Sequence, residues 1–151
     1  MKAIFCSLVI MLFLPVGCAF NPVWEPLGRP GPAAGAVVER DVDLGHGFRR
    51  VVLAEHISYG FESIGHFEYI YYRDLRLGRV DDCSVSPSGN YAIYQEASEG
   101  NLFLFRCSDQ RSKQLTRRFI ELTDLFRWHE EARTVEVQFP SEKSVRVFAL
   151  E

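Results

Sequence analysis

The sequence predicts an all-β domain that follows an export signal and a short irregular segment. Three observations predict this fold class. Residues 67–72 combine aromatic and β-branched side chains, the composition that suits a pleated surface. Residues 134–139 alternate apolar and polar side chains, which indicates a strand with one wet face. Clusters of Ser, Pro, Gly and Asn separate such runs, as expected for an antiparallel meander.

The individual strands differ in the burial that they predict. Residues 102–105 read Leu-Phe-Leu-Phe, a continuous apolar run that indicates burial on both faces or a strand under a second layer. Residues 144–148 alternate at first and end apolar. The four residues 140–143 between the last two strands have the length of a hairpin connection. We therefore expect the chain to end in a β-hairpin.

One segment also fits a helix. Four apolar side chains recur at helical spacing near residues 109–125, namely Leu115, Phe119, Leu122 and Phe126. Aromatic and β-branched residues in the same segment lower its helix propensity. We therefore expect a loop or a short strand here, with a short helix as the alternative.

The first 18 residues have the features of an export signal. Lys2 supplies one positive charge, and an apolar stretch follows to Val16. The stretch is shorter than the roughly 20 residues that a membrane-spanning helix needs. Pro15 and Gly17 also interrupt it. An export signal is therefore the favoured interpretation.

The residues at the cleavage site decide whether the mature protein is attached to a membrane. Residues 15–18 read Pro-Val-Gly-Cys and resemble the lipobox of bacterial lipoproteins, which implies that Cys18 is lipidated. Pro15 departs from the Leu that this family prefers. The alternative is ordinary cleavage after Ala19, with small residues at 17 and 19. We favour lipidation and expect outer-membrane attachment in the periplasm.

The rest of the chain divides into a tether and one domain. Residues 19–36 contain four prolines and three glycines, which favour an extended, irregular tether. Residues 37–151 form one β domain of ordinary size. With the signal removed, 16 Lys and Arg face 20 Asp and Glu, a net charge of −4. This acidity argues against nucleic-acid binding, which depends on neutralising phosphates.

Two cysteines remain in the mature domain, Cys83 and Cys107. An even pair in an oxidising compartment permits a disulfide. Two separate buried thiols are the alternative. In a flat three-stranded meander these residues fall on the two outer strands, farther apart than a disulfide spans. A native bond would therefore contradict that arrangement.

The chain repeats itself at an offset of 43 residues. Residues 86–91 align with 129–134, residues 102–105 align with 145–148, and Val85 aligns with Trp128. Periods of 40 to 45 residues are typical of propeller blades. Within the first copy, Ser86-Pro87-Ser88-Gly89-Asn90 forms a turn motif in which Pro87 fixes φ and Gly89 permits a positive φ.

This motif resembles the Ser-Pro-Asp-Gly-Lys motif of WD40-like blades, found in periplasmic Tol-type and prolyl-oligopeptidase-type propellers. The resemblance covers about residues 80–150, as units 80–122 and 123–151, and Ser88 replaces the family's Asp. It implies blade-like hairpin units stacked in series. Closed propellers typically need four to eight blades, so two or three units predict an open sheet or sandwich, or else a propeller shared between subunits.

The last strand poses a question of pairing. One side of residues 144–150 is expected to pair with residues 134–139. Its other side needs an upstream strand, for which residues 37–42 or 48–53 could serve, or else a second subunit or partner protein. We favour closure by an upstream strand.

The sequence contains none of the familiar catalytic or metal-binding motifs. Its histidines, His46, His56, His66 and His129, show no metal-ligand spacing. Asp41 and Asp43 resemble the start of a calcium loop, but position twelve of that loop is Val52. Glu96 and Glu99 flank a turn, where solvated side chains are the expectation. No cofactor, metal site or catalytic residue is therefore predicted.

The sequence thus predicts a non-catalytic binding or structural protein of the bacterial cell envelope. Its partners would be the membrane, through lipid on Cys18, and an envelope protein or a second copy, through a β edge. The rival interpretation is a small envelope hydrolase whose site is assembled from residues distant in sequence.

Overall fold

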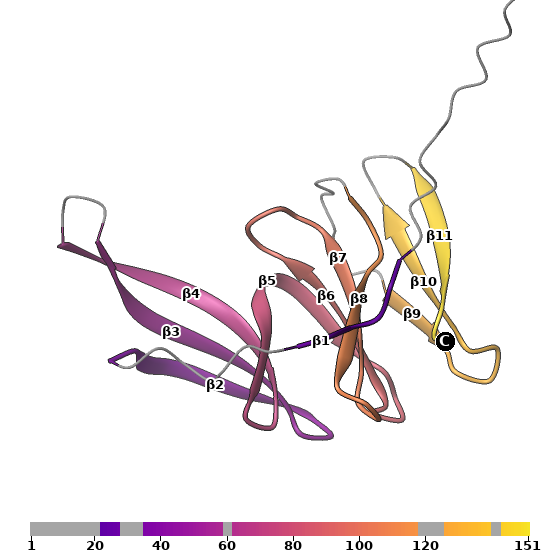
Figure 1. The fold of residues 1–151 in the computed structure, drawn as a ribbon, viewed down its shortest axis with the longest axis horizontal. Helices are drawn as coiled ribbons and strands as arrows, with labels where there is room; N and C mark the ends of the chain where they lie inside the picture. The colour runs from indigo at the N-terminus through magenta and orange to yellow at the C-terminus, as the bar shows by residue number, and fades with distance from the viewer. Residues whose placement is uncertain (1–21, 28–34, 59–61, 118–125, 140–142) are drawn as a thin grey trace, which may run out of the picture.

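The computed structural model describes residues 22–27, 35–58, 62–117, 126–139 and 143–151. The fold is all-β, which confirms the predicted class: an eight-stranded antiparallel meander and a separate three-stranded sheet, not closed into a barrel. Figure 1 shows the strands fanning out from β2–β4 through β5–β8 to β9–β11. The export signal, Cys18 and Ala19 lie outside the described residues.

The large sheet has the strand order β1-β8-β7-β6-β5-β4-β3-β2, and the small sheet has the order β11-β10-β9. The strands of the large sheet are β1 (Glu25–Pro26), β2 (Val37–Gly45), β3 (Phe48–Ser58), β4 (Glu62–Tyr72), β5 (Leu75–Val85), β6 (Tyr91–Glu96), β7 (Leu102–Arg106) and β8 (Arg111–Gln114). Those of the small sheet are β9 (Phe126–His129), β10 (Thr134–Phe139) and β11 (Ser144–Ala149). The strands predicted at 67–72, 102–105, 134–139 and 144–148 are all confirmed.

Strand β5 divides the large sheet into two units. Its first half pairs with β4, up to Arg79 opposite Tyr69. Its second half pairs with β6, from Val80 opposite Glu96 onward. Register shifts accompany both pairings, and such irregularities bend a strand. We call β2–β4 with the first half of β5 the first unit, the second half of β5 with β6–β8 the second unit, and β9–β11 the third unit.

The second unit is buried on both faces. Ile93 and Leu104 belong to a core shared with Val135 and Val137 of the third unit. Tyr94 and Phe105 point to the opposite face, into a core shared with the first unit. Because side chains alternate across a strand, β6 and β7 each supply both cores. The continuous apolar run at 102–105 thus reflects burial on both faces, as predicted.

The third unit repeats the second unit at the predicted offset of 43 residues. Strand β6 begins at Tyr91 and β10 begins at Thr134. Strand β10 pairs with β11 through a regular hairpin ladder, as expected for the end of the chain. The resemblance to WD40-like blades stays a prediction.

The predicted irregular tether is wrong for part of its length. Glu25 and Pro26 pair with Arg111 and Ser112 of β8 and form β1. A proline, which has no N–H, is tolerated because β1 is an edge strand. Figure 1 shows this segment, which we call the strap (residues 22–27), crossing the second unit near the third. The sequence underestimated the strap because one aromatic residue, Trp24, holds it in place.

The expected closure of the last strand by an upstream strand is also wrong. Residues 37–42 and 48–53 belong to β2 and β3, at the far end of the large sheet. Strand β11 is an edge of the small sheet. In the segment that also fitted a helix, residues 111–114 form β8, while 118–125 lie outside the described residues.

The double burial of the second unit predicts a large effect of one core substitution. Leu104 is fully buried, whereas Val145 is 58% exposed. Leu104→Ala should lower the free energy of unfolding by about 2–5 kcal/mol through lost burial and cavity formation. The matched control, Val145→Ala, should change it by about 0.5 kcal/mol or less. Urea unfolding of both variants measures this, and equal effects would contradict the assigned core.

Candidate functional site

The turn singled out by the sequence joins β5 to β6. Ser86 is 1% exposed, and its Oγ accepts a hydrogen bond of 3.2 Å from the Tyr91 N–H. Its carbonyl accepts the Gly89 N–H at 2.8 Å. Gly89 has a φ of 73°, in the region that glycine adopts at little cost. The Ser86 hydroxyl thus stabilises the turn from within.

The next serine connects this turn to the third unit. The Glu130 carboxylate accepts the Ser88 N–H at 3.1 and 3.2 Å and also accepts the Ser88 hydroxyl. Glu130 directly follows β9. A carboxylate that accepts both a backbone and a side-chain donor makes a charge-assisted clamp between the two units.

The first unit contacts the same turn. His46 lies in the turn between β2 and β3, and its Cγ would be 2.2 Å from a Cβ atom placed on Gly89. Only a residue without a side chain permits this approach. The turn of residues 86–90 is therefore a joint, held between His46 of the first unit and Glu130 of the third.

The two cysteines are separate thiols. Cys83 lies opposite Tyr94, which lies opposite Phe103, and Cys107 follows four residues later. Two strand spacings of about 5 Å and an offset of about 13 Å keep them far beyond disulfide reach. The Cys107 Sγ donates to the Gly89 carbonyl at 3.2 Å, so this thiol also belongs to the joint.

Burial lowers the reactivity of both thiols. It raises the pKa of Cys83 to about 11 and that of Cys107 to about 11. Because the thiolate is the nucleophile, neither cysteine is activated near neutral pH. Arg50 near Cys83 opposes the shift but does not cancel it.

The other three histidines are dispersed over the molecule. His66 lies 2.8 Å from Glu39, and His129 lies 3.3 Å from Glu136. His56 is exposed on β3. Among the described residues no group of three or more His, Cys, Asp or Glu side chains could hold a metal ion.

The acidic residues considered for chemistry serve local structure. Asp41 pairs with Arg49 at 2.8 Å, and Asp43 accepts the Gly45 N–H at 2.8 Å. The Glu96 carboxylate accepts the Ser98 hydroxyl at 2.5 and 2.6 Å. These contacts account for carboxylates whose spacing resembled functional patterns.

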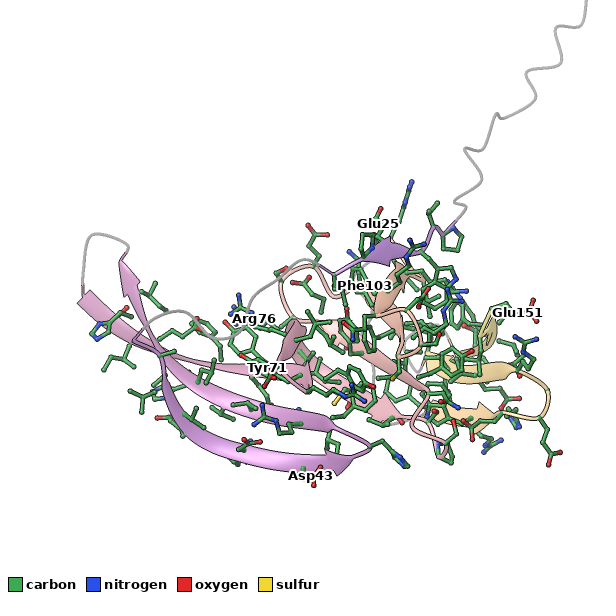
Figure 2. The ribbon with its side chains drawn as sticks, turned by 60° about the horizontal axis from the view of Figure 1, so that its bottom comes forward. Glu25, Asp43, Tyr71, Arg76, Phe103 and Glu151 are labelled. Carbon is green, nitrogen blue, oxygen red and sulfur yellow. The ribbon has the colours of Figure 1, made fainter. Side chains whose placement is uncertain are left out.

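A cavity of about 350 Å³ lies between the strap and residues of β5 to β8. Tyr94 and Phe103 stack with ring centroids 5.5 Å apart and form part of its wall, together with Glu25, Glu96 and Glu99. In Figure 2, Glu25 and Phe103 lie on one side of the molecule and Asp43 lies on the opposite side. The sequence could not indicate this cavity because it depends on the position of the strap.

Trp24 fastens the strap to the end of the chain. Its indole N–H donates to the Glu151 carbonyl at 3.0 Å. The Arg106 guanidinium carbon lies 4.1 Å from a Trp24 ring centroid, and the Lys113 ammonium lies 4.7 Å away, within cation–π range. The buried Lys113 ammonium also donates to the carbonyls of Ala149 and Glu151, at 3.1 and 2.7 Å. We call these contacts the latch.

Comparisons with protein-family models, with curated proteins and with solved structures found no match for this chain. Among the described residues, no helix is long and apolar enough to cross a membrane.

The joint predicts an unusual pair of substitutions. Gly89→Ala should destabilise the protein through contact with His46 and through its positive φ. Adding His46→Ala removes the steric part only, so the double variant should regain part of the lost stability. His46→Ala alone is the control. Thermal unfolding measures all three, and additive losses in the double variant would contradict the contact.

The thiols predict a pH dependence. Below the unfolded pKa of about 9 both states hold their thiol protons, and buried thiols keep them up to about 11. The contribution of the protonated thiols to the free energy of unfolding is therefore complete below pH 9 and is lost as the pH rises to 11. At pH 8, iodoacetamide should alkylate the native thiols about a hundredfold more slowly than the urea-unfolded chain. Equal rates would show that the thiols are not buried.

Proposed function

We propose that this chain is a non-catalytic binding or structural protein of the bacterial envelope, held to the outer membrane by lipid on Cys18. The observation that carries the proposal is the joint at residues 86–90. The chemically capable groups of the predicted motif bond within the turn or to a neighbouring unit: Ser86 to its own turn and Ser88 to Glu130. They stabilise a scaffold.

The latch supports the proposed anchoring. Trp24 is six residues from Cys18, a span of at most about 20 Å when extended. A lipid on Cys18 would thus hold the strap and the C-terminal residues close to the membrane surface. A domain fastened this close to its anchor suits a protein that acts at or beside the membrane.

The repeat supports the family part of the proposal. The second and third units share strand order and an offset of 43 residues, and they pack face to face through one core. We propose that they are WD40-like blades in an open stack. Such repeats commonly present binding surfaces along their length.

The rival proposal is a small hydrolase. It needs a nucleophile that is hydrogen-bonded to a base. The Ser88 hydroxyl does donate to a carboxylate, that of Glu130, but the same carboxylate also accepts the Ser88 backbone N–H, so this pair holds the turn to the third unit. The binding role is therefore the better supported of the two.

The anchor predicts a clear result in cells. Cys18→Ala should abolish labelling by a radioactive fatty acid and release the protein from the membrane fraction. Cys83→Ala, the matched control, should leave both unchanged because Cys83 lies inside the domain. Mature wild-type protein that begins at Phe20 and is found in the soluble fraction would contradict the proposal.

A further inference from the structure

The two long edge strands, β2 and β11, differ in how well they are guarded against pairing. Strand β2 has two register shifts, at Val38/Arg40 and at Asp43/Gly45. It also carries four charged residues in nine positions. Bulges and charges are the usual means by which proteins protect an edge strand. Strand β2 is therefore guarded.

Strand β11 has fewer of these protections, with Arg146 as its one charged residue. It forms six consecutive pairs with β10 and has no register shift. Val145 and Val147 are each 58% exposed, on the face opposite the core. In the second unit the equivalent strand, β7, is covered on this side by β8. No described strand occupies that place beside β11.

The ladder shows which backbone groups of β11 point outward. The Leu150 N–H donates to the Arg133 carbonyl at 2.9 Å, in register with the β10–β11 pairs. Backbone groups of an antiparallel strand alternate between its two neighbours. The even-numbered residues therefore face β10, and the N–H and C=O groups of Val145, Val147 and Ala149 face away from it.

The latch closes part of this edge. The Lys113 ammonium donates hydrogen bonds to the carbonyls of Ala149 and Glu151, and the Trp24 indole also donates to the Glu151 carbonyl. These groups bond carbonyls that a further strand would otherwise bond. The part left open among the described residues is the stretch at Val145 and Val147.

Charge identifies the kind of partner that suits this stretch. Lys143 and Arg146 are exposed at the open part of the edge, and the ammonium of Lys113 lies at its end. No acidic residue lies on β11 itself. A partner strand with acidic side chains would be attracted, and a basic one would be repelled.

A second copy of this chain fits poorly. A symmetric pair of β11 strands must be antiparallel. If it is confined to the open stretch, Val145 pairs with Val147 of the other copy and the two Arg146 residues lie directly opposite each other. Like charges in that position are destabilising.

We propose that an extended acidic segment of another envelope protein adds to β11 as a strand, bonding the outward backbone groups of Val145 and Val147. The inference rests on the proposed binding role and names the edge and partner chemistry for it. Main-chain hydrogen bonds would give affinity, and the charges at the edge would give selectivity.

The orientation of the N–H groups permits a sharp test. Val147→Pro removes an outward N–H donor and none of the β10–β11 hydrogen bonds. Edge strands tolerate a proline at such a position. Val147→Thr keeps the donor and is the matched control. The probes are two synthetic peptides. In one, valine alternates with glutamate, and in the other, valine alternates with lysine. Amide hydrogen exchange by NMR on the mature protein in detergent measures binding.

The glutamate peptide should slow exchange at Val145 and Val147 at least about tenfold in wild type and in Val147→Thr. Val147→Pro should lose binding and still show the wild-type circular dichroism spectrum. Lys143→Glu keeps every strand N–H and should weaken the glutamate peptide about two- to fivefold. It keeps the inference testable if the proline variant does not fold.

Three outcomes would overturn the inference. The lysine peptide could bind equally well, the protection could appear on β2, or the protein alone could show concentration-dependent protection at Val147, which would indicate a second copy. These results are independent of the fatty-acid labelling of Cys18. A failure of the proposed binding at β11 can therefore be distinguished from a failure of the proposed lipid anchor.

Discussion

The burial of the second unit on both faces is the constraint from which the rest of the structure follows. Strands β6 and β7 supply alternate side chains to two separate cores, one shared with the first unit and one with the third. A sheet with two apolar faces is stable in water only when both are covered. The flanking units cover them, and their own inner faces are buried in return. At roughly 1.5–3 kcal/mol for each fully buried large side chain, these two cores dominate the favourable free energy of folding.

Packing of flat faces leaves the relative position of the units underdetermined, and polar contacts at the edges resolve it. The joint at residues 86–90 fixes both neighbours through one turn, because His46 packs on Gly89 and Glu130 binds Ser88. The latch acts in a similar way between the strap and the end of the chain. These contacts join residues far apart in sequence, so no local sequence pattern indicates them.

The sequence predicted the fold where a local pattern decides the structure. The apolar run at 102–105 and the alternation at 134–139 reported their burial directly, and the 43-residue offset matched β6 and β7 to β10 and β11. The sequence offered residues 37–42 as a strand, and they lie in β2, but nothing local placed that strand at the far edge of the large sheet. The pattern failed for β1, which exists because Trp24 finds partners in distant segments. The sequence indicated only part of the joint. Pro87 and Gly89 indicated the turn, but nothing local connects Ser88 to Glu130.

The two outer faces of the stack show why one edge stands out. On the first unit, guanidinium groups of Arg76 and Arg79 lie 5.1 and 4.2 Å from the ring centroids of Tyr69 and Phe67. These arginines cover aromatic surface that a further sheet would otherwise bury. On the third unit, Glu136 lies 3.6 Å from Arg127 and 3.3 Å from His129. Charged side chains thus lie on both outer faces and disfavour the packing of a further sheet. No described strand lies beside the outward backbone groups of Val145 and Val147, so the proposed partner would extend the third unit by hydrogen bonding within its sheet and not by packing another sheet upon it.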